Sequence, residues 1–234
     1  LRRVVQGAWR VMRILLSRTD RIGDLVLSTP AIATVRASFP NGHITMVTSP
    51  YNRVVMDRNT DVDSLVELPR AVKPRSFGAQ FSGYDLAIAL APRAPDLQLV
   101  GATRARVRVG YTYVRRWLAR FTSRLYVNRV MVSPADPDLC DAQPSRIVPH
   151  EVEQLLQLVA LGGATTRVER LRVDITDADR AALAHLPESP IVVHLGMRWF
   201  TSGSTLASTL LLMERLRALG VPFVLSCASE CEAY

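Results

Sequence analysis

The chain has 234 residues, of which 48% are hydrophobic, and its formal net charge is +8. This composition is too apolar for a disordered polymer, and the length suffices for one large core or for one and a half ordinary domains. Because no apolar run approaches the roughly 18 residues that a membrane span needs, we expect a globular, cytoplasmic protein and not an integral membrane protein.

Residues 1–12 form an N-terminal extension of uncertain start. The stretch LRRVVQGAWRVMR lacks the apolar core and the small-residue cleavage site of a signal peptide, and Met12 stands just ahead of the first apolar run. Lys73 is the only lysine, so nearly all of the basicity comes from arginine. Arginine suits planar recognition of phosphate and carboxylate groups, although a biased base composition of the genome explains such a skew equally well.

Apolar runs then alternate with helical periodicity along the chain. Strands are predicted over residues 13–18, 43–49, 62–68, 84–91 and 105–111. Helices are predicted between them, over residues 24–38, 52–58, 75–82 and 95–104. Short connections between parallel strands favour an α/β fold with a doubly wound, Rossmann-like parallel sheet.

The pattern becomes irregular over residues 112–149, and helical spacing resumes over 150–163. Residues 111–126 interleave arginines with aromatic residues. Such a segment can contact anionic lipid or a phosphorylated glycolipid acceptor. We favour the alternative, an amphipathic helix that buries Trp117 and Phe121 and exposes its arginines to water.

A domain boundary is predicted near residues 175–190, so that the first domain spans residues 13–180. The elements predicted after the boundary are a strand over 189–196, a helix over 206–219 and a strand over 222–226. Two strands and one helix cannot complete a second doubly wound domain, which needs on the order of 100 residues. We therefore expect residues 188–234 to be the truncated start of a second Rossmann-like domain, in a fragment or in a protein whose second domain is broken.

The turn after the first predicted strand, RTDRIGD, holds the candidate catalytic residue. It lacks the GxGxxG spacing of a dinucleotide site, so an NAD-type cofactor is not expected. Asp24 instead places a carboxylate at the start of a helix, where the helix dipole stabilises the charge and where the charge would repel a phosphate. Asp24 either caps its helix or acts as a general base at the carboxyl edge of the sheet, where open α/β folds bind ligands.

The segment RILLSRTDRIGDLVLSTPAIATVRASFPNGHITMVTSPYN resembles the N-terminus of glycosyltransferase family 9, the heptosyltransferases of lipopolysaccharide core assembly. Further blocks of that family, in the family's order, are similar to the stretches NTDVDSLVEL, GYDLAIAL, GATRARVRVGY, HEVEQLLQLVALG and IVVHLG. The resemblance covers most of residues 13–200.

This resemblance implies a two-domain fold of the GT-B type and an inverting, metal-independent transferase. The first domain would hold the acceptor and the second the nucleotide-sugar. In the family, the Asp of the RxGD block is the base that takes a proton from the acceptor hydroxyl, and the matching residue here is Asp24. Arg18 and Arg21 flank this turn and could pair with anionic groups of the acceptor, although surface arginines without a ligand role are commoner.

Donor binding is expected in the loop that follows the strand predicted over 189–196. Small residues and free N–H groups before a helix form a site for anions. The candidate donor-binding residues are His194, Gly196, Arg198, Ser202, Gly203 and Ser204. The family's loop commonly carries a lysine at the donor phosphates; here Arg198 either replaces it or the phosphate contact is weaker. For His194, a place in the core at the end of the strand is an equally good interpretation.

The predicted function is transfer of a heptose, or of a related sugar, from a nucleotide-sugar such as ADP-heptose to an acceptor of the lipopolysaccharide-core type. The alternative is a truncated, non-catalytic remnant or binding module that keeps the acceptor domain but lacks a complete donor site, so activity of the 234-residue chain itself stays open. We expect a monomer without a cofactor. A metal ion is not expected because the histidines are not grouped, and nucleic acid is not expected because no RNA-binding signature is present. Peripheral contact with the cytoplasmic face of the inner membrane is a further expectation.

Overall fold

The computed structural model describes residues 10–114, 116–134, 149–196, 201 and 203–227. The chain divides into two compact units, Leu1–Asp174 and Ile175–Tyr234. The last residues of the predicted first domain, those after Asp174, therefore group with the second unit. Most of the predicted N-terminal extension lies outside the described residues.

The first unit contains one sheet of six parallel strands. The strands are β1 (Arg13–Ser17), β2 (His43–Thr48), β3 (Ser64–Glu67), β4 (Leu86–Ala89), β5 (Val107–Tyr113) and β6 (Arg129–Ser133). Their order across the sheet is β3-β2-β1-β4-β5-β6, so the strand order reverses between β1 and β4. Ligands of doubly wound sheets bind at the carboxyl edge beside such a reversal. The predicted α/β fold with a doubly wound parallel sheet is confirmed, with one strand more than the five predicted.

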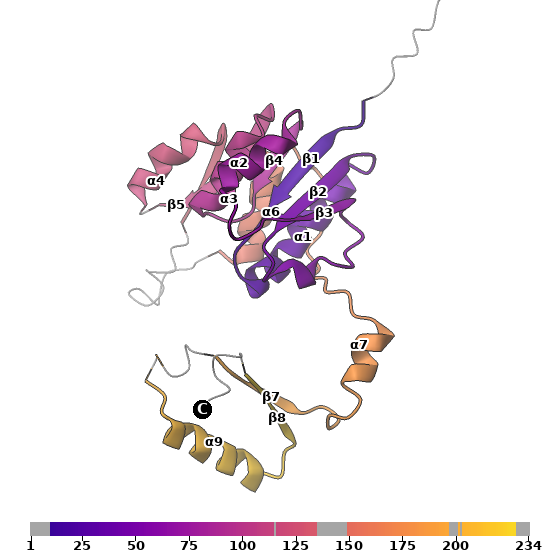
Figure 1. Ribbon diagram of the computed structural model, residues 1–234, viewed down its shortest axis with the longest axis vertical. Helices are drawn as coiled ribbons and strands as arrows, with labels where there is room; N and C mark the ends of the chain where they lie inside the picture. Colours follow the sequence, from indigo (N-terminus) through magenta and orange to yellow (C-terminus); the bar gives the residue numbers. More distant parts are fainter. Residues whose placement is uncertain (1–9, 115, 135–148, 197–200, 202, 228–234) are drawn as a thin grey trace, which may run out of the picture. The chain divides into compact units, whose positions relative to one another are not determined.

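Helices cover both faces of this sheet (Figure 1). The main ones are α1 (Ile22–Ser38), α2 (Pro74–Gly78), α3 (Ala94–Ala102) and α6 (Glu151–Leu161), with the 3-10 turns η1 (Arg53–Val55) and η2 (Ala79–Phe81). α1 and α6 pack on one face, and α2 and α3 pack on the other. Along β1, Ile14 and Leu16 belong to the first core cluster and Leu15 to the second, all fully buried. A parallel sheet buried on both faces needs such continuous apolar strands, which is why the apolar runs predicted β1, β2 and β4 well.

The segment after β5 differs from the prediction. Residues 112–149 are not irregular throughout, because the described part contains α4 (Trp117–Thr122), the 3-10 turn η3 (Ser123–Leu125) and β6. β6 forms the edge of the sheet and pairs in parallel with β5. Only Ser133 of this strand is buried, so β6 lacks the apolar run by which the other strands were predicted. The predicted burial of Trp117 and Phe121 is also wrong, since 62% and 67% of their surfaces are exposed.

An extended segment after α6 runs along α1 and is held by hydroxyl side chains of that helix. Ser38 Oγ accepts hydrogen bonds from the backbone N–H groups of Thr165 and Thr166, both at 3.0 Å. Thr34 Oγ1 accepts from Val168 N at 2.9 Å. Side-chain acceptors on a helix surface thus replace the sheet partner that an extended backbone normally requires.

The second unit contains α7 (Asp177–Ala182), β7 (Ile191–Leu195), α9 (Leu206–Ala218) and β8 (Phe223–Cys227). β7 and β8 pair in parallel, as a strand–helix–strand connection requires. These elements agree with the predicted strand, helix and strand, whereas α7 was not predicted. Among the described residues of this unit only Thr209 is buried. None of the described helices of the chain is long and apolar enough to cross a membrane.

Candidate functional site

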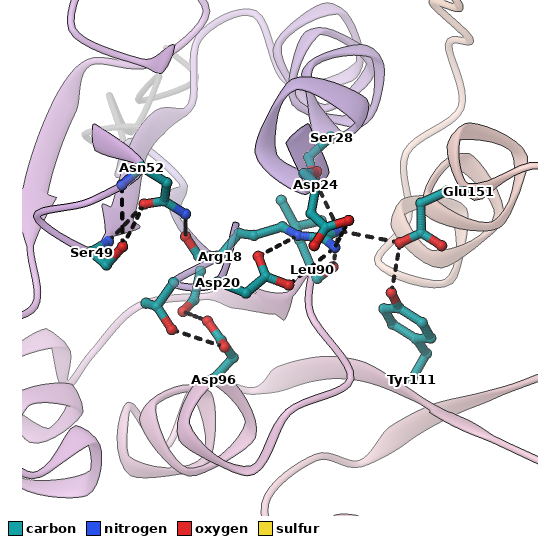
Figure 2. Close-up of polar contacts among 12 residues, drawn as sticks. Arg18, Asp20, Asp24, Ser28, Ser49, Asn52, Leu90, Asp96, Tyr111 and Glu151 are labelled. Carbon is teal, nitrogen blue, oxygen red and sulfur yellow. Dashed lines mark hydrogen bonds and ion pairs between the residues drawn. The ribbon is translucent and has the colours of Figure 1, made fainter. Parts of the chain in front are cut away.

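A network of charged side chains lies at the carboxyl end of β1, around Arg18 (Figure 2). Arg18 is the first residue after β1, and its side chain is only 3% exposed. Its Nε donates to Asp20 Oδ1 at 2.9 Å, and its Nη1 donates to the backbone oxygen of Leu90, directly after β4, at 2.7 Å. A buried guanidinium is tolerated only when it is paired and hydrogen-bonded, so these contacts hold the Arg18 side chain in place.

The same guanidinium reaches side chains from α1 and α6. Its Nη1 lies 3.2 Å from Ser28 Oγ and 3.3 Å from Glu151 Oε1, and its Nη2 lies 3.8 Å from Asp24 Oδ1. One positive charge therefore faces three carboxyl groups, those of Asp20, Asp24 and Glu151. Since the three carboxylates outnumber the cation, each of them is repelled by the other two.

Asp24 lies in the first turn of α1, but it does not cap the helix. Arg21 occupies the N-cap position with an extended backbone and no capping hydrogen bond from its side chain. In the described part of the chain, the contact of the Asp24 carboxylate is its ion pair with Arg18, and no backbone N–H donates to it. The capping interpretation requires such an N–H bond and is not supported. The Asp24 side chain is 34% exposed, so a ligand can reach it.

The surroundings of Asp24 make it a stronger base than an ordinary aspartate. Partial burial raises the pKa of Asp24 above its usual value, and the charges of Asp20 and Glu151 raise it further. Arg18 and Arg21 act in the opposite direction and limit the rise of this pKa. A general base is most effective when its pKa approaches the working pH, so this environment suits proton abstraction.

Glu151 is fixed by a second hydrogen bond. Tyr111, on β5, is 1% exposed, and its hydroxyl donates to Glu151 Oε1 at 2.8 Å. Burial raises the pKa of Tyr111 well above its usual range, so the hydroxyl remains a donor. Glu151 therefore receives donors from Arg18 and Tyr111 on the same oxygen, which fixes its position in the first turn of α6.

A fully buried acid, Asp96, anchors the backbone that carries Arg18. Asp96 lies in the first turn of α3 and accepts from Ser17 Oγ at 2.7 Å and from Thr19 Oγ1 at 3.0 Å. Burial raises the pKa of Asp96 to about 6, although both hydrogen bonds lower it. Asn52 Nδ2 donates to the Arg18 carbonyl oxygen at 3.0 Å. Asp96 thus fixes the residues before and after Arg18, and Asn52 fixes the carbonyl group of Arg18 itself.

A cavity of about 390 Å³ opens beside this network, at the carboxyl ends of β1, β2 and β3. Its lining residues are Thr19, Asp20, Ser49, Pro50, Tyr51, Leu68, Pro69, Arg70, Val72, Pro74 and Arg93. Asp20 joins the cavity to the network, because its carboxylate also binds Arg18. Arg70 and Arg93 bring positive charge to the cavity, and the sequence analysis missed both. Their position in the sequence could have identified them, because each follows a strand of the sheet by a few residues.

The two arginines predicted to bind the acceptor differ in their surroundings. Arg21 is exposed at the start of α1, where a ligand can reach it. Arg18 is buried, and its donors are engaged by the protein. Contact between Arg18 and an acceptor therefore stays a prediction. The geometry of Arg18 indicates instead that its guanidinium positions the carboxyl groups of Asp20, Asp24 and Glu151.

The predicted donor-binding residues belong to the second unit. His194 on β7 is exposed, and its Nδ1 lies 3.3 Å from Ser226 Oγ. The alternative prediction placed His194 in a core at the end of its strand, and the exposed side chain does not agree with it. Gly196 follows β7, and Gly203 has a φ of 99°, which favours glycine.

Near the start of α9, the N–H groups of Thr205 and Ser208 are bonded within a capping box, and Ser204 lies just before it. Arg198 and Ser202 lie outside the described residues.

The described residues contain no cluster of three or more His, Cys, Asp or Glu side chains that could hold a metal ion. The carboxyl groups around Arg18 are held by a guanidinium and by hydroxyl donors. This network can orient a carboxylate and move a proton, and Asp24 is the most exposed of its three carboxyl groups.

Comparison with known proteins identifies relatives only at the level of structure. No model of a protein family and no curated protein sequence matches the chain. A glycosyl transferase family 9 protein from Veillonella parvula matches with a TM-score of 0.63 at 15% identity. The ADP-heptose LPS heptosyltransferase II of E. coli matches with a TM-score of 0.58 at 14% identity, and E. coli heptosyltransferase WaaC, solved with ADP, with a TM-score of 0.57 at 17% identity.

Each of these matches covers 92% of the chain, and the likeness is one of fold. The chain spans 69%, 64% and 66% of the three solved structures, so it corresponds to about two thirds of their length. These three solved structures are thus those of a family 9 glycosyltransferase and of two heptosyltransferases, and family 9 is the family that the sequence resembles.

Proposed function

We propose that this chain carries the acceptor-binding part of an inverting glycosyltransferase of family 9, with Asp24 as the catalytic base. The observation that carries the proposal is the state of the Asp24 carboxylate. It lies at the carboxyl edge of the sheet, is partly exposed, is not used as a helix cap and has a raised pKa. The likeness in fold to heptosyltransferases supports the same proposal.

The proposed reaction is a single displacement at the anomeric carbon of a nucleotide-sugar. Asp24 accepts the proton of an acceptor hydroxyl, and the oxygen of that hydroxyl forms a bond to the anomeric carbon. The bond from that carbon to the diphosphate breaks at the same time, and its electron pair leaves on the phosphate oxygen. Such a reaction needs one base on the acceptor side and positive charge or N–H donors at the leaving group.

Arg18 and Glu151 are positioning residues in this proposal. Arg18 holds Asp24 by the 3.8 Å ion pair, and Glu151 holds Arg18 from the other side. Because Arg18 is anchored to the backbone at Leu90, its positive charge keeps a fixed place beside the carboxylate of Asp24. Arg21, Arg70 and Arg93 are exposed cations that can bind anionic groups of the acceptor.

For the donor we propose a nucleotide-sugar, with ADP-heptose as the first candidate, and for the acceptor a glycolipid of the lipopolysaccharide-core type. Three of the solved structures similar to the chain are E. coli heptosyltransferases, one solved with ADP and one with ADP-2-deoxy-2-fluoro heptose. Donor contacts would come from His194, Gly196, Arg198 and the stretch 202–204. The proposal requires neither a metal ion nor a cofactor, because Asp24 is the base and Arg198 a cation for the diphosphate.

The test is Asp24→Asn in a protein that includes the complete donor-binding part. We expect transfer of heptose from ADP-heptose to a deacylated core acceptor to fall by at least about 100-fold, because the amide cannot accept the proton. Donor binding, measured by calorimetry, should stay nearly unchanged, since Asp24 lies on the acceptor side. Asp20→Asn is a matched control that removes a carboxylate from the same network and should retain more activity. Equal turnover by the parent protein and Asp24→Asn would refute the assignment.

The alternative of a non-catalytic binding module is not favoured, because nothing in the binding of an acceptor alone calls for a carboxylate with a raised pKa. It makes a different prediction for the same variant. If the chain only bound the acceptor, Asp24→Asn would change acceptor affinity, and no transfer would be detected with either protein.

A further inference from the structure

The helix α4 and the turn η3 present large apolar side chains to solvent. Trp117, Leu118, Phe121 and Leu125 are exposed over 62%, 60%, 67% and 77% of their surfaces. We call these four residues, together with Arg116, Arg120 and Arg124, the α4 surface. In Figure 1, α4 lies at the outer end of the first unit, beyond β5.

The apolar members of the α4 surface share one side of the helix. With about 100° of rotation per residue, positions 117, 118 and 121 fall within an arc of about 100°, and position 125 continues the same arc. The arginines at 116, 120 and 124 fall on the adjoining arc. All three arginines are exposed, and in the described part of the chain none of them forms an ion pair.

The side of this segment that faces the rest of the unit carries small side chains. Ala119, Thr122 and Ser123 line a cavity of about 310 Å³ together with Arg116, and Ser123 is 1% exposed. The large apolar residues of α4 face solvent, whereas those of a usual surface helix face inward. An exposed apolar patch rimmed by charge marks a surface that binds a partner.

We propose that the α4 surface docks on an anionic lipid bilayer. Tryptophan and phenylalanine at the centre enter the region between headgroups and acyl chains, as in interfacial amphipathic helices. Arginines beside them meet the negative headgroups, and each basic side chain near an anionic surface raises binding by a factor of about five. Arg120 and Arg124 make this contact, whereas Arg116 lines the cavity beneath the helix and its guanidinium lies 5.3 Å from the centroid of the Tyr113 ring.

Charge and side-chain type favour lipid over two other occupants. A second copy of the chain would bring the three arginines close to their own copies around a two-fold axis, which is unfavourable. Single-stranded nucleic acid binds by stacking bases on aromatic rings, but Leu118 and Leu125 offer no ring for stacking. A bilayer accepts aliphatic and aromatic side chains equally and supplies the negative charge.

The experiment is co-sedimentation of the whole chain with vesicles of phosphatidylglycerol and phosphatidylcholine, compared with phosphatidylcholine alone. We expect binding to the anionic vesicles that weakens as salt is added. Arg120→Gln with Arg124→Gln should lower the partition coefficient by roughly 20-fold. Trp117→Ser with Phe121→Ser should abolish binding. Leu125→Ser, outside α4, provides a variant that keeps the helix sequence intact and should also weaken binding.

Two matched controls test whether loss of binding is specific to the α4 surface. Val54→Ser removes an apolar side chain of similar exposure, 65%, from η1, and Arg106→Gln with Arg170→Gln removes two exposed arginines elsewhere in the unit. The apolar control should bind like the parent, and the charge control should lose much less than the α4 variants. Circular dichroism confirms that each variant is folded.

Three results would overturn the proposal. The first is no vesicle binding by the parent chain, and the second is equal losses in the controls and in the α4 variants. The third is that the same residues are needed for self-association, measured by sedimentation velocity, or for binding to an oligonucleotide, but not for binding to vesicles. The assay contains no sugar donor, so its outcome is independent of the proposed transfer reaction.

Discussion

The basicity of Asp24 depends on the balance between Arg18 and Glu151. Arg18 lowers the pKa of Asp24 and Glu151 raises it, against the background of partial burial, which raises it most. Both partners act on Asp24 without contacting a substrate in the proposed reaction. Removing the charge of Arg18 and removing the charge of Glu151 should therefore shift the pH dependence of transfer in opposite directions.

We expect Glu151→Gln to lower the pKa of Asp24 and to shift the acidic limb of kcat/KM to lower pH, by roughly half a pH unit. Arg18→Gln should shift the same limb to higher pH and should destabilise the fold by about 2–4 kcal/mol, because it leaves three partly buried carboxylates without their shared cation. The measurement is a pH–rate profile of both variants beside the parent protein. A Glu151→Gln profile with an unmoved acidic limb would show that this residue has no influence on the base, even if Arg18→Gln fails to fold.

Asp96 should make the stability of the fold depend on pH. Burial raises its pKa from 3.8 to about 6, so between these pH values the folded state holds a proton that the unfolded state has released. The free energy of unfolding then falls as pH rises from about 4 to about 6.5, by about 3 kcal/mol in total from this group. Asp96→Asn lacks this contribution. Urea unfolding of both proteins across this range gives the difference between them, and parallel curves would contradict the raised pKa.

At the scale of secondary structure, two helical glycines have different surroundings. A Cβ atom at Gly23, in the first turn of α1, would meet nothing within 4 Å. A Cβ atom at Gly78, the last residue of α2, would overlap with the carbonyl oxygen of Leu99 on α3. Gly78 is therefore required by the close approach of α2 and α3, whereas no packing contact among the described residues explains Gly23.

We expect Gly78→Ala to destabilise the protein by about 1–3 kcal/mol, because the helices must move apart. Gly23→Ala should instead stabilise it by about 0.5–1 kcal/mol, because alanine is the better helix former. Gly23 adjoins Asp24, so the added methyl group should lower transfer activity by obstructing the acceptor. Thermal unfolding and transfer assays of the two variants test both statements. Full activity of Gly23→Ala would show that the acceptor does not use the open space at this position.

The pattern of apolar residues predicted the buried strands better than the edge of the sheet. β1, β2 and β4 are apolar on both sides because helices cover both faces, and such runs are visible in sequence. β6 is an edge strand with one buried residue, and α4 turns its large apolar residues outward. Neither element carries the pattern of a buried core element, which is why this segment was predicted incorrectly.

At the scale of the whole molecule, the two units differ in how much apolar surface they bury. The first unit contains both core clusters, whereas the described part of the second unit has a two-stranded sheet and one buried residue. A unit that buries so little apolar surface is only marginally stable by itself. The chain also spans about two thirds of the solved structures that it matches.

Amide hydrogen exchange should therefore separate the units. We expect the amides of β1 and β4, in the centre of the six-stranded sheet, to exchange slowest, with protection that approaches the global free energy of unfolding. The amides of β7, β8 and α9 should exchange at least about 100-fold faster in the 234-residue chain. Mass spectrometry of the exchanged peptides provides the comparison. Equal protection of both units would mean that the second unit is stabilised by contacts beyond its own two strands and helices.

The sequence by itself determined the α/β class and the order of the strands from β1 to β5, because these depend on local apolar patterns. The resemblance of its first turn to that of glycosyltransferase family 9 singled out Asp24 as the candidate base. Only the tertiary structure decided what surrounds Asp24. Glu151 lies 133 residues from Arg18 along the chain, and Asp96 lies 77 residues from Thr19. No local pattern encodes such contacts, because they arise when the sheet brings the first turns of α1, α3 and α6 together at one edge. Burial at that edge also makes Arg18 a partner of three carboxyl groups and not a surface cation.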